Sequence, residues 1–484
     1  MTSVFLQPGS WGRFSELPIR LDAVAALKEI GVSLIRVGGS FAIADWYFWK
    51  HWRGPVWERP PASWQDSLLS GLGPFEMLDL AAALDTTSAD CQPGNPNPLF
   101  GCRATNATSN STNPATPEAM AELVEYCYGG ANTTWGAQRI SDGRYIRDAG
   151  VPLASRGARQ RQMYAAAVVL PADKLKAMEA KAIELGVGKQ IHYVYPWGRL
   201  MGALATTPQR QALAKVASAL QLGVRLVLDQ HTGAARGRLQ SAVPQFEADA
   251  RNPLFSVDNH SQWGFANFET NTGNYFFSDA LDEAADLFLW FGLNGSLAKR
   301  VKGRAKCFCM ERSGYNEGGA NEQGMVWSLP NMTWLQPPAQ VHKLLTESWQ
   351  PVGLAVEQSC AGDGPAIAPL GLLNVSSAVS ADGHRLVLRI VNIQTSFVNT
   401  TLRLPAARGS DSNGGHHSVT PAWRVDSVTT LEQTQAVNSP AQPERIRPRQ
   451  RPELLHAEKT VLPVPPTSFV VVVFEQLHAI KTIL

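Results

Sequence analysis

The chain has 484 residues, more than one ordinary domain, and 44% of them are hydrophobic while 17% are charged. This balance excludes disordered and fibrous proteins, because such a chain can bury large cores. Its 43 Lys and Arg against 41 Asp and Glu leave a net charge of +2. The composition therefore gives no general attraction to nucleic acid or anionic membranes, and we expect an uncharged partner.

Neither a membrane span nor a secretory leader is evident. The strongly apolar stretch Ser468–Phe474 is far shorter than the roughly 20 residues that cross a bilayer. Met1–Phe14 lacks the basic region and apolar block of a signal peptide, so the protein stays inside the cell or lacks upstream residues. The density of Asn-x-Ser/Thr acceptors favours a secreted glycoprotein, although a Ser/Thr-rich chain also produces them by chance. They are Asn106, Asn110, Asn132, Asn259, Asn294, Asn331, Asn374 and Asn399.

Six cysteines permit up to three disulfides, but they are too few in so long a chain for a disulfide scaffold. They are Cys91, Cys102, Cys127, Cys307, Cys309 and Cys360. The Cys307-Phe308-Cys309 spacing is too short for a CxxC redox or zinc pair, so we interpret it as strand and expect no metal site.

In chain order, the first signals are a helix and a strand. Asp22 is a plausible N-cap for a helix over Ala23–Ile30, and the β-branched run Val32–Val37 follows as a strand. Helical spacing returns at Phe75–Leu84 and Pro117–Tyr128. The stretch between these two helices, Gln92–Ala115, is rich in Asn, Pro, Thr and Ser and is predicted to be an exposed loop.

Helices and strands then alternate, which is typical of parallel strands joined by crossover helices. The predicted helices are Ala172–Leu185, Pro208–Leu222, Asp279–Phe291 and Pro338–Trp349. The predicted strands are Ile191–Tyr195, Arg225–Gln230, Phe265–Phe268 and Lys306–Met310.

After about Pro351 only short strand signals remain, at Leu386–Val391, Thr400–Leu404 and Phe469–Phe474. We therefore predict a (β/α)8 TIM barrel over residues 1–350, followed by an antiparallel β-sandwich over 351–484. The basic Pro-rich run Pro440–Pro452 is interpreted as a solvated loop, because nothing else in the chain favours nucleic acid.

Two carboxylates are candidates for catalysis, because the chemistry of a barrel lies at the carboxyl ends of its strands. Glu269 ends the strand Phe265–Phe268 and precedes a loop of small polar residues. Glu311 ends the next predicted strand, but Arg312 offers it an ion-pair partner. His231 closes another strand. Each of the three could equally be structural, since strand-end Glu and lone His residues often are.

Other residues suggest a sugar site. Arg36 lies in an otherwise apolar strand, so something acidic should face its guanidinium. Aromatic residues crowd a loop-like stretch, where they either stack on sugar rings or form core: Trp46, Tyr47, Trp49, Trp52, Trp57 and Trp64. Zinc spacings, a Walker loop, a dinucleotide fingerprint and a Gly-x-Ser-x-Gly elbow are all absent from the sequence, so we expect no cofactor.

Several blocks resemble family 51 glycoside hydrolases, the α-L-arabinofuranosidases. The resemblance rests on Leu34-Ile35-Arg36-Val37-Gly38-Gly39-Ser40-Phe41, Trp52-Arg53-Gly54-Pro55 with Arg59-Pro60, Gly73-Pro74-Phe75-Glu76, and Leu123–Gly129 with Thr134-Trp135-Gly136 and Arg139. Asp229-Gln230-His231 is similar to the family's Asp-x-His strand end, and Phe268-Glu269 is similar to its nucleophile strand.

The resemblance implies a retaining glycosidase acting on arabinose-containing polysaccharide or oligosaccharide, with two carboxyls about 5 to 5.5 Å apart. Glu269 would be the nucleophile, held ionised by Arg36. The substrate-binding residues would be Arg36, Ser40, Trp52, Asp229 and His231. The family usually has Asn in place of Ser40 and Tyr in place of Gly233.

The family's Gly-Asn-Glu acid/base has no counterpart where it is expected. Val151–Met163 contains no Asp or Glu, and Glu184 closes a later helix. General acid catalysis contributes roughly 10² to 10⁴-fold, so the hydrolase is expected to be impaired. The alternatives are a non-catalytic carbohydrate-binding protein on a degenerate glycosidase fold, or a faulty gene model across Val151–Met163. The oligomeric state is not readable from the sequence.

Overall fold

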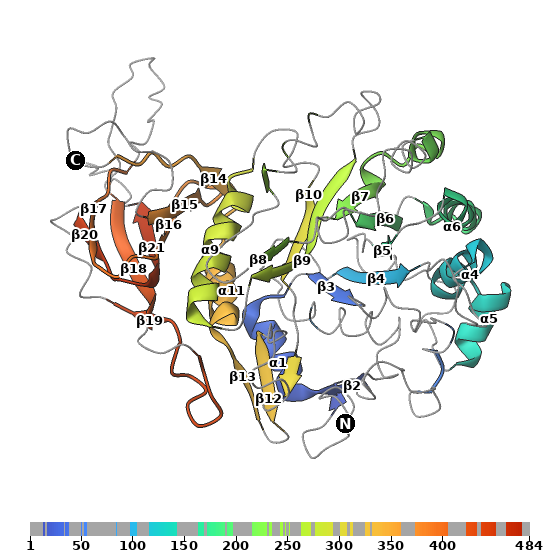
Figure 1. Cartoon of the computed structure of the whole chain (residues 1–484), viewed down its shortest axis with the longest axis horizontal. Coiled ribbons are helices and arrows are strands. Elements are labelled where there is room, and N and C mark those ends of the chain that lie inside the picture. Colours follow the sequence, from blue (N-terminus) through green and yellow to red (C-terminus); the bar gives the residue numbers. More distant parts are fainter. Residues whose placement is uncertain are drawn as a thin grey trace, which may run out of the picture. The chain divides into compact units, whose positions relative to one another are not determined.

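The computed structural model of the chain forms two compact units (Figure 1). Unit 1 comprises residues 1–234, 240–271 and 294–333, and unit 2 comprises residues 235–239, 272–293 and 334–484. The structure describes residues 13–14, 17–32, 34–37, 50, 53–55, 84, 97–103, 116–142, 163–168, 172–188, 191–196, 215–229, 232–234, 243–244, 247, 251, 263–272, 276–293, 301–306, 310–312, 325–329, 332–359, 373–404, 423–432, 437–451 and 461–476.

Unit 1 begins with a short antiparallel pair, β1 (Arg13–Phe14) and β2 (Leu17–Arg20), and the helix α1 (Leu21–Ile30). The helix starts earlier than predicted, so Asp22 lies in the first turn rather than at the N-cap. There its carboxylate accepts hydrogen bonds from Ala23 N at 3.0 Å and from the Thr333 hydroxyl at 2.6 Å. A negative charge is favourable at this end of a helix. Gly31, with φ of 74°, ends α1.

The centre of unit 1 is a sheet of seven parallel strands in chain order, with the short β8 (Thr232–Ala234) paired to β9. The seven strands are β3 (Leu34–Val37), β4 (Asn97–Arg103), β5 (Met163–Val168), β6 (Ile191–Pro196), β7 (Leu226–Asp229), β9 (Gly264–Thr272) and β10 (Val301–Lys306). The last strand, β10, lies near the first, β3. This order confirms the predicted parallel α/β arrangement, and the closure of eight strands into a barrel stays a prediction.

After α1, three helices of unit 1 are described from end to end: α4 (Pro117–Tyr128), α5 (Thr134–Ser141) and α6 (Ala172–Glu184). Of these, α4 and α6 were predicted from the sequence and α5 was not. The 3₁₀ turn η5 (Gly223–Arg225) leads into β7, after helical residues at 215–219. Phe75–Leu84 lies outside the described residues except for Leu84, which is helical.

Two predictions in this unit were wrong, one of a loop and one of a strand. The stretch Gln92–Ala115, predicted to be an exposed loop, contains β4, which pairs with β3 and β5. Its few apolar residues are surrounded by Asn, Pro and Thr, and this composition hid the strand. The strand predicted at Lys306–Met310 instead ends at Lys306 as β10, while Met310 opens a separate strand, β11 (Met310–Arg312). Cys307 and Cys309 lie outside the described residues.

Strand β11 pairs in parallel with β12 (Val326–Leu329), and β13 (Met332–Leu335) completes that three-stranded sheet before α11 (Pro337–Glu347).

Unit 2 is built on an antiparallel sheet in the order β14-β15-β16-β21-β18-β19. Its strands are β14 (Val352–Leu354), β15 (Leu373–Val379), β16 (Arg385–Asn392), β18 (Trp423–Glu432), β19 (Arg449–Gln450) and β21 (Ser468–Gln476). Central strands β16 and β21 are buried along nearly their whole length, as expected for strands covered on both faces. The sheet confirms the predicted change to antiparallel strands.

Each face of this sheet has its own apolar cluster. Helices α9 (Phe277–Phe291) and α11 cover one face, where Phe288 packs on Phe469 with ring centroids 6.0 Å apart (Figure 1). The other cluster joins the sheet to a two-stranded layer, β17 (Val398–Thr401) and β20 (Val461–Val464). Both helices precede residue 351, although they belong to unit 2, and the domain division predicted at residue 350 stays a prediction.

A buried arginine holds the two helices to the sheet. Arg389 on β16 is 2% exposed, and its Nε donates to the Ser348 hydroxyl at 3.0 Å, while its Nη2 donates to the Ser348 carbonyl. Its guanidinium also lies over Phe291, 5.6 Å from the ring centroid. Ser348 and Phe291 mark the C-terminal ends of α11 and α9, where a positive charge is favourable. Burial lowers the pKa of Arg389 to about 10.

The basic segment Pro440–Pro452 is held by its own chain. Arg447 pairs with Glu444 at 2.5 Å, Arg451 pairs with Glu432, and Arg445 donates to Gln442 at 2.8 Å. Carboxylates that neutralise two of these arginines weaken any attraction to phosphate. The prediction of a solvated loop was wrong in part, because Arg449 and Gln450 form β19 and Ile446 is buried.

Two further observations bear on predictions from the sequence. Cys127 is unpaired and buried in α4, where burial raises the pKa of its thiol to about 12. The six cysteines therefore do not form three disulfides, and this thiol is unreactive. Among the residues that the structure describes, no helix combines the length and hydrophobicity needed to cross a membrane.

Candidate functional site

Three predicted site residues lie in the carboxyl halves of strands of one parallel sheet. Arg36 is in β3, Asp229 is the last residue of β7, and Glu269 is in β9. In the β7–β9 register Asp229 is opposite Ala266, three residues before Glu269. Because β10 pairs with β9 and lies near β3, one strand separates the strand of Glu269 from that of Arg36. All three residues thus lie toward the carboxyl ends of their strands, the end at which α/β enzymes bind their ligands.

Glu311 has a different position. It lies on β11, opposite Trp327 of β12 in a separate small sheet. Of the two carboxylate candidates, only Glu269 lies on the parallel sheet that also contains Arg36 and Asp229.

The remaining predicted residues are less informative. Ser40, Trp52 and His231 lie outside the described residues, as does Val151–Met163 except for Met163, which opens β5. Glu184, the other carboxylate weighed as an acid, is 62% exposed and pairs with Lys181 at 2.7 Å. Its exposure at the end of α6 is typical of a surface ion pair, not of a catalytic acid.

The residue after Trp52 is anchored. Nη1 of Arg53 donates to both carboxylate oxygens of Asp142, at 2.9 and 3.0 Å. The same carboxylate accepts from the Tyr126 hydroxyl and from the Gln138 amide, each at 2.8 Å. Burial is the largest cause that raises the pKa of Tyr126 above its ordinary value, and the hydrogen bond to Asp142 adds to it. Asp142 thus fixes the segment that directly follows Trp52.

Side chains of α4 complete this anchor. Glu125 accepts a hydrogen bond from Trp135 N at 2.9 Å and pairs with Lys181 at 3.2 Å. Burial alone would raise the pKa of Glu125, but these two partners outweigh it, so the pKa is lowered and the carboxylate stays ionised. The Trp135 ring carries the Lys50 ammonium 4.7 Å from its centroid. The Arg53 guanidinium also lies over this ring, with Cζ 5.8 Å from the centroid, so two cations contact the indole.

The turn between α4 and α5, together with the start of α5, tolerates few other residue types. A Cβ on Gly136 would lie 2.1 Å from the carbonyl oxygen of Gly130, so no larger side chain fits. The Thr133 hydroxyl caps α5 by accepting from Gly136 N at 3.1 Å. Arg139, only 1% exposed, donates to the carbonyls of Tyr126 and Gly129, each at 2.8 Å. These contacts fix the end of α4, the turn and the start of α5 relative to one another.

Sequence reasoning missed Asp142, which is the acceptor of this cluster. The sequence did contain one signal, Arg53. A partly buried arginine needs an acidic partner, and Arg53 lies within a block that resembles a known family. That partner lies 89 residues away along the chain, a separation that periodicity cannot bridge.

We expect Asp142→Ala to lower the free energy of unfolding by about 2 to 3 kcal/mol, because three donors lose their shared acceptor. Chemical denaturation followed by tryptophan fluorescence measures this change. Asp173→Ala, at an exposed position in α6, is the matched control and should change the value by no more than about 0.5 kcal/mol. Equal effects of the two variants would show that Asp142 anchors nothing.

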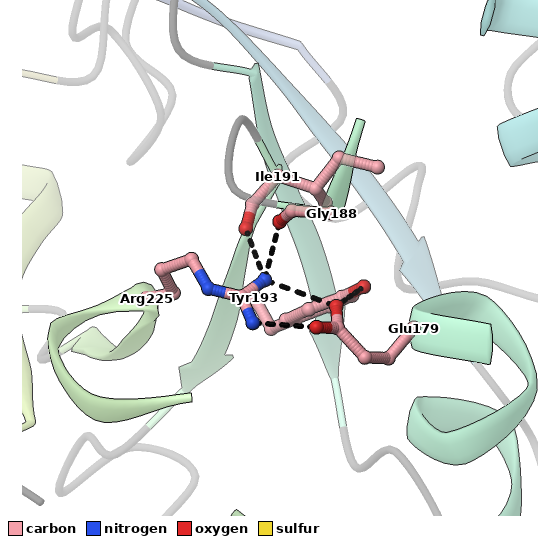
Figure 2. Close-up of polar contacts among 5 residues, drawn as sticks. All are labelled: Glu179, Gly188, Ile191, Tyr193 and Arg225. Atoms are coloured by element: carbon pink, nitrogen blue, oxygen red, sulfur yellow. Dashed lines mark hydrogen bonds and ion pairs between the residues drawn. The ribbon is translucent and has the colours of Figure 1, made fainter. Parts of the chain in front are cut away.

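A second buried polar cluster joins α6, β6 and η5. Figure 2 shows the Arg225 guanidinium directed at Glu179 and at the carbonyls of Gly188 and Ile191. Glu179 is 2% exposed, accepts from Arg225 Nη1 at 3.0 Å, and accepts from the Tyr193 hydroxyl at 2.7 Å. Burial, followed by the charge of Glu179, raises the pKa of Tyr193 far above its ordinary value, so this hydroxyl remains a neutral donor.

The position of this cluster decides its role. Ile191 is the first residue of β6, and Arg225 directly precedes β7. The cluster therefore lies at the amino ends of the strands, opposite the end that carries Asp229. The amino ends of the strands in parallel α/β folds serve stability, while ligands bind at the carboxyl ends, so we assign Glu179, Tyr193 and Arg225 a structural role.

Comparison with known proteins confirms the resemblance found in the sequence. Residues 26–145 match the family described as Alpha-L-arabinofuranosidase 1 domain. This region includes Arg36, Ser40, Trp52 and the Asp142 cluster, and it ends before Asp229 and Glu269. No curated protein is significantly similar to the chain in sequence.

Solved structures are similar over almost the whole chain. An α-L-arabinofuranosidase from Thermotoga maritima, in complex with arabinose, shares 15% identity with a TM-score of 0.65, covering 98% of this chain and 93% of its own. Family 51 enzymes from Bifidobacterium longum and Xanthomonas axonopodis pv. citri share 13% and 16% identity, with TM-scores of 0.63 and 0.61. Each of these two comparisons covers 97% of this chain and 92% of the other. At these identities the similarity is one of fold.

Proposed function

We propose that the chain is a retaining glycoside hydrolase that removes α-L-arabinofuranosyl residues from polysaccharides or oligosaccharides, with Glu269 as the nucleophile. The observation that carries this proposal is the placement of Glu269 on the parallel sheet of Arg36 and Asp229, in a fold similar to arabinofuranosidases over 97 to 98% of the chain. The proposal includes closure of that sheet into the (β/α)8 barrel.

In the proposed reaction the Glu269 carboxylate attacks the anomeric carbon of the arabinofuranosyl group. The bond to the leaving oxygen breaks, and a glycosyl ester forms on Glu269. Water then attacks the same carbon, which releases arabinose and restores the carboxylate. Arg36 would keep Glu269 ionised, because a neighbouring positive charge favours a carboxylate. Ser40, Trp52, Asp229 and His231 would hold the sugar.

Proton donation is where this chain departs from the family pattern. Val151–Met163 contains no Asp or Glu, so a departing alkoxide receives no proton from that segment. Substrates whose leaving group is already a weak base need no such help. The dependence of rate on the leaving group therefore tests the proposed function.

We expect a nitrophenyl α-L-arabinofuranoside to be hydrolysed on the order of 10² to 10⁴ times faster than a methyl α-L-arabinofuranoside, the range that general acid catalysis normally supplies. Initial rates with purified protein measure this ratio. A ratio near that of a family 51 enzyme with its acid/base intact would show that another residue donates the proton.

The alternative is a carbohydrate-binding protein that has lost catalysis, and the carboxylate-free segment Val151–Met163 is the observation that favours it. Calorimetric titration with arabino-oligosaccharides, together with assays on the activated aryl glycoside, separates the two functions. Saturable binding without release of the phenol supports the binding protein, and release of the phenol supports the hydrolase.

The cellular location of the protein is also part of the proposal. We propose a secreted glycoprotein, supported by eight Asn-x-Ser/Thr acceptors and by a polysaccharide substrate. Immunodetection of the native protein in cell extract and in medium tests this location.

A further inference from the structure

The two-stranded layer of unit 2 exposes an unusual face. Along β17 the side chains alternate: Val398 packs on the apolar cluster beneath, while Asn399 and Thr401 are exposed. The two-residue period of a strand places Asn399 and Thr401 on one face, and the exposed Phe397 directly precedes the strand. Phe397 is 64% exposed, and a group that covered its ring would remove apolar surface from water, which is favourable.

The same face carries a modification signal. Asn399-Thr400-Thr401 is an Asn-x-Thr acceptor, and both its asparagine and its threonine are exposed. On β20 the residue opposite Asn399 is Pro463, and the residue opposite Thr401 is the 39% exposed Val461. Asn399 therefore stands within a small apolar surface made by Phe397, Val461 and Pro463.

We propose that Asn399 is an N-glycan attachment site and that the first sugar of the glycan packs on the exposed ring of Phe397. The sugar's C–H face is apolar, and it matches an exposed ring that lies two residues before Asn399 in the chain. In the attachment step the Asn399 amide nitrogen bonds to the anomeric carbon of a lipid-linked oligosaccharide. The amide loses one proton, and the lipid pyrophosphate leaves.

The position suits the modification in a second way. Among the described strands β17 pairs only with β20, so its other edge has no strand partner there. A bulky hydrophilic group at such an edge blocks pairing with another chain, as charged residues do elsewhere. Asn374 gives the contrast, because this asparagine is only half-exposed and the serine of its acceptor, Ser376, is 8% exposed.

The test is expression of the full chain in a eukaryotic host, with a secretion signal added, and mass spectrometry of its glycopeptides. Enzymatic deglycosylation in heavy-oxygen water marks each occupied asparagine. We expect Asn399 to be occupied more fully than Asn374 and to lose its glycan in Thr401→Ala but not in Thr401→Ser. An unmodified Asn399 in the secreted protein, or higher occupancy at Asn374, overturns the proposal.

Packing on Phe397 is tested by a double-mutant cycle of thermal stability. In the glycosylated protein Phe397→Ala should lower the melting temperature by about 2 °C or more, and in the Thr401→Ala background it should change little. Ile393→Ala, at a 52% exposed position outside β17, is the matched control and should act equally in both backgrounds. Equal effects of Phe397→Ala in both backgrounds overturn the packing. These readouts do not depend on hydrolase activity.

Discussion

Glu269→Gln is expected to lower kcat on a nitrophenyl α-L-arabinofuranoside by on the order of 10⁴-fold or more, as removal of an enzyme's nucleophile does. The amide has nearly the shape of the carboxylate but cannot form the glycosyl ester. Because an activated aryl glycoside needs no proton donor, this substrate reports on the nucleophile separately from the missing acid. Steady-state rates with matched protein preparations measure the change.

Two carboxylates supply the controls for that experiment. Glu184→Gln, at an exposed position at the end of α6, should leave turnover within about twofold, as remote surface substitutions usually do. Glu311→Gln tests the rival nucleophile, which lies on the separate β11–β12 sheet. Loss of turnover in Glu311→Gln with normal turnover in Glu269→Gln would transfer the role to Glu311.

Arg225→Met should lower the free energy of unfolding by about 3 to 5 kcal/mol, the cost of removing one partner of a buried ion pair. The change leaves the buried Glu179 carboxylate with only the Tyr193 hydroxyl among the partners described above, and it removes a donor from two backbone carbonyls. Methionine fills a similar volume, so the loss reports mainly on charge and hydrogen bonding. Equilibrium denaturation provides the measurement.

The surface pair Arg251–Glu247 is the matched control for the buried one. Its atoms are 4.0 Å apart and Arg251 is 79% exposed, so Arg251→Met should cost less than about 1 kcal/mol. The double variant Glu179→Gln with Arg225→Met should recover part of the stability, because no buried charge is left alone. A loss below about 1 kcal/mol in Arg225→Met would mean that this cluster does not support the fold.

Local patterns were enough to predict much of the secondary structure. Helices α4, α6, α9 and α11 lie within two residues of their predicted bounds, because each presents an apolar stripe at helical spacing to a core. The final strand β21 was predicted from its run of valines, which the structure buries in the centre of the antiparallel sheet.

Strands with weak local signals were missed. In β4 only Leu99 and Phe100 are strongly apolar, and β5 consists largely of alanine. Both become strands because neighbouring parallel strands supply their hydrogen bonds, a non-local effect that propensity does not contain. The same limit applies to α9, whose packing on the C-terminal sheet depends on residues far along the chain, such as Phe469 against Phe288.

Some residues of the candidate site could likewise be predicted from local patterns, and others could not. Asp229 could be named from the sequence because it ends β7, and its common sheet with Glu269 follows from the alternation of helices and strands. Glu269 was predicted to end the strand Phe265–Phe268, but β9 continues to Thr272, so Glu269 lies inside the strand, three residues before its end. Asp142 could not be named, because its role depends on Arg53, Tyr126 and Gln138 meeting at one carboxylate. Such convergence is a property of tertiary structure.

The central claim, that Glu269 attacks the sugar, predicts a covalent intermediate. Because no carboxylate in Val151–Met163 can activate water, hydrolysis of the glycosyl ester should be slow, and the ester should accumulate when the protein meets a nitrophenyl α-L-arabinofuranoside. Peptide mass spectrometry after acid quenching is the direct measurement. We predict one arabinosyl group on Glu269. An arabinosyl group on Glu311, or release of the phenol with no labelled carboxylate at any time, would contradict the account.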